Sequence, residues 1–322
     1  MTLNLAPVIE NMAGRRRERG SDVRAATMTL VVYFEDAAIG ALARERIRLL
    51  SAKHPSRVIV LDGCSDASEQ RVETSEWVEL GVRNSDGAAL RSAAETLRLP
   101  DAPVILLWIA SGIAEDPRFA AMLGDDVELI VYNSSLLNDE SAALCELAEY
   151  VEKHPQLRIA DIAYLRLLPW QESVAILFDG SAVQELADLR SVEILCGSKP
   201  EGYYLLGWLA SRLRWTAASS GALTGRHGQS IEYAIRREGE PRRVARVALR
   251  SSTSEFVAEV DERSETIRLS VSGTRQHPLR YRAVNNPGIA ALVERAILWG
   301  HNDKVFADSL AAAGQILGCE SR

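Results

Sequence analysis

Histidines are the first residues to consider for acid–base or metal chemistry, because imidazole titrates near neutral pH and binds metals. The chain has five: His54, His154, His227, His277 and His301. Three of them stand directly before proline, which predicts positions in turns. Neither an H-x-x-x-H nor an H-E-x-x-H spacing occurs, so the sequence predicts no histidine metal site.

The motifs that cradle phosphates or expose a nucleophilic serine are also missing. G-x-G-x-x-G, G-x-x-x-x-G-K-[ST] and G-x-S-x-G do not occur, which argues against dinucleotide and nucleotide binding. Two glycine-bearing segments leave anion binding open. Gly197–Gly202 lies between an expected strand and helix, where free backbone N–H groups can hold an anion. Gly221–Gly228 is basic at its end. An ordinary turn and a surface loop are the alternative interpretations.

Carboxylates and cysteines give weaker signals. The adjacent pairs Asp125-Asp126 and Asp261-Glu262 fall in expected loops, where a solvated role is the simpler interpretation. No C-x-x-C pair joins the four cysteines Cys64, Cys145, Cys196 and Cys319. That spacing predicts reduced thiols rather than a disulfide framework or a zinc site. Nothing basic adjoins Cys64, so its thiolate has no obvious stabilising charge.

Arginines gather in one region of the chain. Residues 226–282 contain 12 Arg against 8 Asp plus Glu, which leaves this region at +4 and the remainder at −11. The arginines expected to point outward from strands are Arg246, Arg250, Arg268, Arg280 and Arg282. Such a face could dock an acidic protein, because arginine favours planar, bidentate contacts. A phosphorylated ligand, an RNA, or simple pairing with neighbouring glutamates are the alternatives. No aromatic residues are expected among these outward-facing arginines, which argues against RNA.

Trp170 is a further candidate for partner binding. It follows Pro169 at the expected junction between two domains. Its ring either fills the junction or is displayed to a partner.

The elements that must position these residues follow from composition and pattern. The chain has 322 residues, of which 47% are hydrophobic and 25% charged, with a net charge of −7. Its length predicts about two domains, and the composition is that of a soluble globular protein. No apolar run reaches the about 20 residues that span a bilayer. The arginine-bearing N-terminus lacks the apolar core of a secretory signal, so a cytoplasmic protein is expected.

We predict a flexible arm over residues 1–24, an N-terminal domain over 25–165 and a C-terminal domain over 166–322. The N-terminal domain alternates strands and helices, which predicts an α/β layer structure with a mixed or largely parallel sheet. The C-terminal domain is predicted as α+β, with an antiparallel meander and two closing helices. Strict alternation predicts one buried face for the meander, marked by Ile231/Tyr233/Ile235, Ala245/Val247/Leu249, Phe256/Ala258/Val260, Ile267/Leu269/Val271 and Leu279/Tyr281/Ala283.

Four segments together resemble a known family. They are His54-Pro-Ser-Arg-Val-Ile-Val60, Leu99-Pro-Asp-Ala-Pro-Val104 with Trp108, Leu165-Arg-Leu-Leu-Pro-Trp170, and Leu205-Leu-Gly-Trp-Leu-Ala-Ser-Arg-Leu213. Their order and separation resemble the OpcA family of glucose-6-phosphate dehydrogenase assembly proteins in cyanobacteria and actinobacteria. The resemblance covers roughly Ala26 to Arg282.

The resemblance implies a non-catalytic partner of glucose-6-phosphate dehydrogenase, the NADP-linked enzyme that opens the oxidative pentose phosphate pathway. Such a protein binds the dehydrogenase, favours its active oligomer and raises its apparent substrate affinity. It implies no cofactor or metal in this chain. In cyanobacteria the family is linked to thioredoxin, and no regulatory cysteine maps onto the four here. The alternative is a sensor or enzyme for a sugar phosphate, using the Gly197–Gly202 turn with Arg226 or Arg246.

Overall fold

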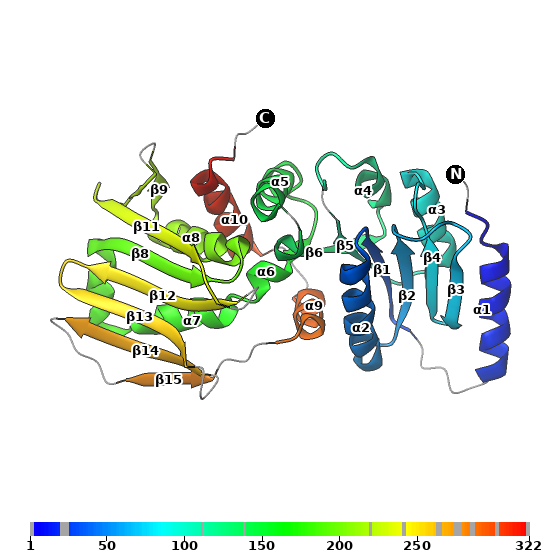
Figure 1. The fold of residues 1–322 in the computed structure, drawn as a ribbon, viewed down its shortest axis with the longest axis horizontal. Coiled ribbons are helices and arrows are strands. Elements are labelled where there is room, and N and C mark those ends of the chain that lie inside the picture. The colour runs from blue at the N-terminus through cyan, green and yellow to red at the C-terminus, as the bar shows by residue number, and fades with distance from the viewer. Residues whose placement is uncertain are drawn as a thin grey trace. The chain divides into compact units, whose positions relative to one another are not determined.

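The structure, a computed structural model, describes residues 3–19, 26–110, 112–137, 139–218, 221–239, 243–261, 266–273, 279–283, 287–299 and 303–319. The chain divides into two compact units, each with its own sheet (Figure 1). Unit 1 comprises Met1–Leu137, His154–Ile162 and Gly288–Asn302. Unit 2 comprises Asn138–Lys153, Ala163–Pro287 and Asp303–Arg322. The sequence predicts one boundary near residue 165. In the structure the chain enters unit 1 again at Gly288–Asn302.

Unit 1 is built on a seven-stranded sheet in the order β3-β4-β2-β1-β5-β6-β7. All neighbouring pairs are parallel except β3–β4. The predicted α/β domain with a largely parallel sheet is therefore confirmed. Its strands are β1 (Met28–Phe34), β2 (Ser56–Asp62), β3 (Gln70–Thr74), β4 (Trp77–Gly81), β5 (Val104–Ile109), β6 (Val127–Tyr132) and β7 (Ile159–Asp161).

The helices of unit 1 begin where the sequence supplies a cap. Asp36 caps α2 (Ala37–Lys53), which ends at His54 directly before Pro55. Asp86 caps α3 (Gly87–Leu97), and Asp116 caps α4 (Pro117–Met122). A side-chain oxygen at this position accepts a backbone N–H that the helix cannot satisfy itself. Within the arm expected over residues 1–24, residues 6–19 form helix α1 (Ala6–Arg19), which packs against β3 (Figure 1).

Helix α9 (Ile289–Leu298) belongs to unit 1, although the sequence placed it among the closing helices of the C-terminal domain. Its buried face, Leu292, Val293 and Ala296, packs toward α2 and β6. Arg158 holds the end of this helix: its Nη2 donates to the carbonyl oxygens of Ala296 at 2.6 Å and Ile297 at 2.9 Å.

Replacing Arg158 with methionine is expected to loosen α9 from unit 1. The change removes a charged donor from two helix-end carbonyls, and such hydrogen bonds contribute about 1.5–3 kcal/mol. Hydrogen exchange of the α9 amides measures the effect. The matched control is Arg295→Met, an exposed arginine on the same helix, for which a change within about 0.5 kcal/mol is expected. Equal protection in both variants would show that Arg158 does not hold the helix.

Unit 2 is built on an eight-stranded sheet in the order β15-β14-β13-β12-β8-β11-β10-β9. Strands β8 and β11 are parallel, and the other pairs are antiparallel. The bounds are β8 (Leu189–Cys196), β9 (Thr216–Ala217), β10 (Leu223–Thr224), β11 (Ser230–Arg237), β12 (Val244–Ser251), β13 (Ser254–Asp261), β14 (Thr266–Gly273) and β15 (Arg280–Ala283).

Helices α7 and α8 pack on one face of this sheet (Figure 1). Helices α5 and α10 pack against α8. The helices of unit 2 are α5 (Glu140–Lys153), α6 (Ile162–Leu165), α7 (Leu168–Leu177), the 3-10 helix η3 (Gly180–Asp188), α8 (Lys199–Leu213) and α10 (Lys304–Leu317). Asp139 caps the first turn of α5, where its Oδ1 accepts from Ala142 N at 3.0 Å.

The predicted antiparallel meander is confirmed as β12–β13–β14–β15. Its buried face carries Val247, Phe256, Ile267 and their alternate neighbours. The prediction was wrong for the last strand, where Leu279 is 49% and Tyr281 58% exposed. Tyr281 lies opposite Arg268 in the ladder, and directly opposite residues share a face. The alternation on β15 is therefore shifted by one residue, so that Tyr281 points to the side opposite α7 and α8.

Candidate functional site

The carboxyl edge of the unit 1 sheet is where a parallel sheet of this kind binds ligands. The chain runs from β1 through α2 to β2 on one side of β1, while β5 lies on the other side. In such sheets the crevice at the switch point takes the ligand, and a glycine-rich turn admits its phosphates. Here the turn after β1 reads Glu35-Asp36-Ala37. Two carboxylates thus stand at the start of α2.

Both carboxylates are bound to groups of the chain itself. The Asp36 side chain accepts from Ile39 N at 2.9 Å. Glu35 lies 2.6 Å from Arg118 and accepts from the Tyr33 hydroxyl at 2.7 Å. Burial raises the pKa of Tyr33, and its hydrogen bond to Glu35 raises it further. This arrangement disfavours an anionic ligand at the start of α2. The ligand would be repelled by the two carboxylates, and the N–H group of Ile39 already donates to Asp36.

Asp62, at the carboxyl end of β2, is held in the same way. In dinucleotide-binding sheets an acidic residue after the second strand takes the ribose hydroxyls. Asp62 instead lies 2.6 Å from Arg44 and accepts from Cys64 N at 2.8 Å. Arg44 also donates to Glu79 at 3.0 Å. The carboxylates at the ends of β1 and β2 are therefore engaged in internal ion pairs and hydrogen bonds.

The Gly197–Gly202 turn, one of the two predicted anion positions, is filled by a carboxylate of the chain. Helix α8 begins at Lys199, whose backbone N donates to Glu140 Oε2 at 3.0 Å. Glu201, 1% exposed, lies in the first turn and pairs with Arg166 at 2.9 Å. Burial, followed by the charge of Glu201, raises the pKa of the adjacent Cys196 thiol to about 12. An anion would have to displace Glu140.

The Gly221–Gly228 segment contains the short strand β10 (Leu223–Thr224), which is followed by a tight turn. Gly225 N donates to Gln229 O at 2.8 Å, and Gly228 N donates to Gly225 O at 2.9 Å. His227 N donates to the Gln229 side chain at 3.0 Å. Arg226 is exposed. These three N–H groups donate to acceptors within the turn, so they are not available to bind a phosphate.

The five predicted arginines divide between the two faces of the unit 2 sheet. We define the outer face as the side of β11, β8, β12, β13 and β14 opposite α7 and α8. Arg246, Arg250 and Arg268 lie on this outer face. Arg280 and Arg282 lie on the other side, because they stand opposite the buried Leu269 and Ile267 in the ladder. The expectation that all five share one face was therefore wrong.

The outer-face arginines are paired with glutamates. Arg250 lies 2.8 Å from Glu255 and 3.6 Å from Glu193. Arg246 lies within 4 Å of Glu193, Glu255 and Glu259, at 3.5, 3.8 and 3.7 Å. Arg268 pairs with Glu259, and on the opposite side of the sheet Arg282 pairs with Glu172. The outer face therefore alternates in charge and is not simply basic.

Trp170 lies in α7 and is 5% exposed. Its ring is part of the core of unit 2. A partner could reach it only after a rearrangement of this helix.

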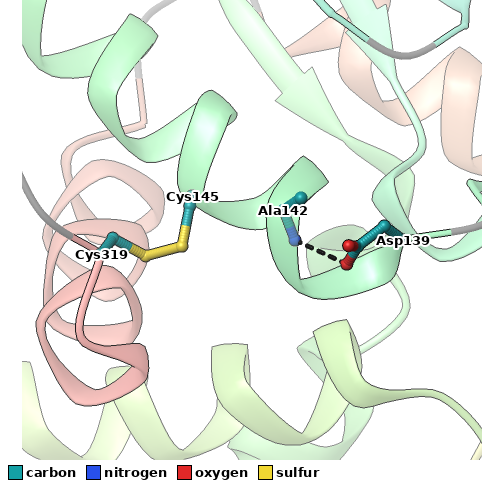
Figure 2. The surroundings of a disulfide bond; sticks show 4 residues. All are labelled: Asp139, Ala142, Cys145 and Cys319. Atoms are coloured by element: carbon teal, nitrogen blue, oxygen red, sulfur yellow. Dashed lines mark hydrogen bonds between the residues drawn. A yellow bond between two sulfur atoms is a disulfide. The ribbon is translucent and has the colours of Figure 1, made fainter. Parts of the chain in front are cut away.

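The cysteine prediction needs a correction. Cys145 on α5 and Cys319, just beyond α10, form a disulfide with Cα atoms 5.5 Å apart (Figure 2). They are 174 residues apart in sequence, so no spacing rule could reveal the pair. Cys64 and Cys196 are free thiols. Burial, followed by the charge of Asp62, raises the pKa of Cys64, which disfavours its reactive thiolate.

Sequence reasoning also missed an apolar recess in unit 1. It lies between α2 and α9 over β5 and β6, and Ile39, Leu42, Ile289 and Val293 contribute to its lining. Within the described residues no group of three or more His, Cys, Asp or Glu side chains is placed to hold a metal. In that same part of the chain, every helix is too short or too polar to cross a bilayer.

The comparisons with known proteins agree with the resemblance noted in the sequence. Residues 157–310 match the family model for the C-terminal domain of the OpcA glucose-6-phosphate dehydrogenase subunit. Over 127 residues the chain is 39% identical to the OxPP cycle protein OpcA of Synechocystis sp. strain PCC 6803, covering 38% of this chain and 26% of that protein. The protein of the same name from Synechococcus elongatus is 25% identical over 158 residues, 48% of this chain and 35% of that protein. The matches thus span between a quarter and about a third of these relatives.

Solved structures share the fold at low sequence identity. Two variants of KijD10, a 3-ketoreductase from Actinomadura kijaniata crystallised with TDP-benzene and NADP, superpose with TM-scores of 0.52 and 0.54. They are 12% and 13% identical, and the match covers 90% of this chain and 95% of each of theirs. This likeness concerns the fold alone. With four sequence segments in register, a family model over residues 157–310 and relatives of one name, the chain is similar to the OpcA family, most clearly in its C-terminal half.

Proposed function

We propose that this protein is a non-catalytic assembly factor and allosteric activator of glucose-6-phosphate dehydrogenase. In this proposal it binds the dehydrogenase in the cytoplasm and favours its active oligomer. The match to the dehydrogenase-subunit family supports the partner. The relatives' name supports a role in the oxidative pentose phosphate pathway.

The non-catalytic part of the proposal rests on the two helix N-termini where a ligand phosphate would bind. Carboxylates of the chain already bind there. Asp36 caps α2 where a cofactor phosphate would approach, and Glu140 caps α8 where a sugar phosphate would approach. Helix N-termini attract anions through free N–H groups and the helix dipole. Because the chain's own carboxylates occupy both places, protein binding is favoured over the sugar-phosphate alternative.

Activation by binding requires a difference in affinity between two states of the dehydrogenase. A tenfold shift toward the active state needs only about 1.4 kcal/mol of differential binding. A few interface residues can contribute that much. No reacting group on the activator is needed.

For the contact residues we propose the edge strand β15 of unit 2. Arg280 is exposed there, beside the exposed Leu279 and Tyr281. Arg282, on the same strand, forms an ion pair with Glu172 and is part of the proposed contact surface. An edge strand offers unpaired backbone groups together with side chains.

Mixing the purified chain with the dehydrogenase of its own organism tests the proposal. We expect a complex on gel filtration, a larger dehydrogenase oligomer and a lower KM for glucose 6-phosphate. Arg280→Glu is expected to weaken the complex about five- to tenfold, since it reverses an interface charge. The matched control, Arg16→Glu on α1, should bind as the wild type does. Absence of both a complex and a kinetic change, with or without reductant, would contradict the proposal.

The same samples separate the alternative function. A thermal-shift series with pentose-pathway metabolites should leave the melting temperature of this chain unchanged. Stabilisation by a sugar phosphate would instead favour the sensor. Thioredoxin is the second partner that we propose, and the Cys145–Cys319 bond is the disulfide on which it would act.

A further inference from the structure

The outer face of the unit 2 sheet has a repeating charge pattern at its centre. In the β12–β13 ladder, Arg246 lies opposite Glu259, Ala248 opposite Val257, and Arg250 opposite Glu255. The positions on β12 are thus positive, small, positive, and those on β13 are negative, apolar, negative. The two charged rows balance, so this surface neither attracts nor repels a partner through net charge.

From this pattern we propose that the outer face pairs with the same face of a second copy of this chain. Consider a two-fold axis lying between two such faces, parallel to the strands and midway between β12 and β13. It places β12 of one copy over β13 of the other. Arg246 then lies over the second copy's Glu259, and Arg250 lies over its Glu255. Between them Ala248 lies over the second copy's Val257, and both of these side chains are buried beneath the charged ones.

A two-fold interface requires a surface that is complementary to itself. Stacked sheets keep their strands within about 30° of each other and lie about 10 Å apart, so the central rows stay in register. At that separation each arginine lies between a glutamate of its own sheet and one of the other copy. Networks of this kind contribute more than isolated surface pairs.

The available area is that of a weak dimer. The axis places β12 over β13 and β8 over β14, and each of these four strands has eight residues. With strands about 4.8 Å apart and residues about 3.3 Å long, the overlapping face covers about 500 Å² per copy. Two faces bury about 1,000 Å², below the range of standard protein interfaces. The dimer is therefore expected to depend on protein and salt concentration.

An acidic partner suits this face less well. Arg246, Arg250 and Arg268 already lie against Glu193, Glu255 and Glu259. A uniformly negative surface would meet these glutamates as well as the arginines, and like charges in contact oppose binding. A second copy presents glutamates opposite these arginines and arginines opposite these glutamates. This inference stands without the proposed function; combined with it, a dimer would present two dehydrogenase-binding edges.

The test is an exchange of charge within the face. A six-residue variant carries Arg246→Glu, Arg250→Glu, Arg268→Glu, Glu193→Arg, Glu255→Arg and Glu259→Arg. Its main ion pairs within the sheet are kept with opposite sign, so it is expected to fold. The pattern of this variant is complementary to itself but not to the wild type. Sedimentation equilibrium at low salt and mixing of fluorophore-labelled chains are the measurements.

We expect wild type and exchange variant each to form dimers, and the two to avoid mixed dimers by at least about tenfold. High salt should weaken both homodimers, because exposed charges are screened. A smaller variant, Arg246→Glu with Arg250→Glu, should dissociate at least about tenfold more easily than wild type.

Three results would overturn the inference: a monomeric wild type, free mixing of wild type with the exchange variant, or loss of dehydrogenase binding in the exchange variant while wild type alone is monomeric. The last result would assign the face to the dehydrogenase. Self-association is measured on this chain alone, so failure of the dimer and failure of the proposed function are distinguishable.

Discussion

Gly207→Ala is expected to destabilise unit 2 by about 3 kcal/mol, at the upper end of the cost of overpacking a core. Gly207 lies on α8 where α10 passes closely. A Cβ atom at this position would lie 2.2 Å from the carbonyl oxygen of Ser309 and 2.8 Å from Ala313 N. Both are backbone atoms, so the added methyl group forces the two helices apart. Urea unfolding followed by tryptophan fluorescence measures the loss.

A matched control exists on another helix. Gly14 lies within α1, and a Cβ there meets nothing within 4 Å. Gly14→Ala should therefore stabilise the protein by about 0.5–1 kcal/mol, because alanine favours the helix over glycine. The same chemical change thus has opposite expected effects at two sites. If Gly207→Ala unfolds like the wild type, α8 and α10 do not pack closely at this crossing.

Reducing the Cys145–Cys319 disulfide is expected to lower the stability of unit 2 by about 2–5 kcal/mol, the range for native disulfides. The bond joins α5 to the residues just beyond α10, and both helices pack against α8. For a separation of 174 residues, the chain-entropy model gives about 5 kcal/mol as the effect on the unfolded state. Denaturant unfolding with and without reductant measures the difference.

Two cysteine variants complete this experiment. Cys145→Ser should lose the same stability and no longer respond to reductant. Cys64→Ser should respond as the wild type does, because Cys64 is a free thiol. A wild type whose unfolding is unchanged by reductant would show that the bond does not stabilise the unit. A dehydrogenase assay on the same three proteins tests the proposed link to thioredoxin.

The faces on which the predicted arginines lie depended on how the strands pair. The sequence placed Arg280 and Arg282 with Arg246 on one face, since all five arginines followed an alternating pattern. The register of β14 with β15 separates them, because Arg280 lies opposite Leu269. A shift of one residue turns every side chain of a strand to the other face. Alternation shows that a strand has two faces, but only pairing shows which face is covered.

The fold class, the meander and the resemblance to the OpcA family followed from the sequence itself. Apolar runs such as Val104–Ile109 and caps such as Asp36 and Asp86 act over a few neighbouring residues, so the sequence around them is sufficient to place them. The carboxylate of Glu140 at α8, the guanidinium of Arg158 at α9 and the Cys145–Cys319 bond join residues far apart in the chain. These contacts were decided by tertiary structure, because packing of helices and strands, rather than distance along the chain, brings their atoms together.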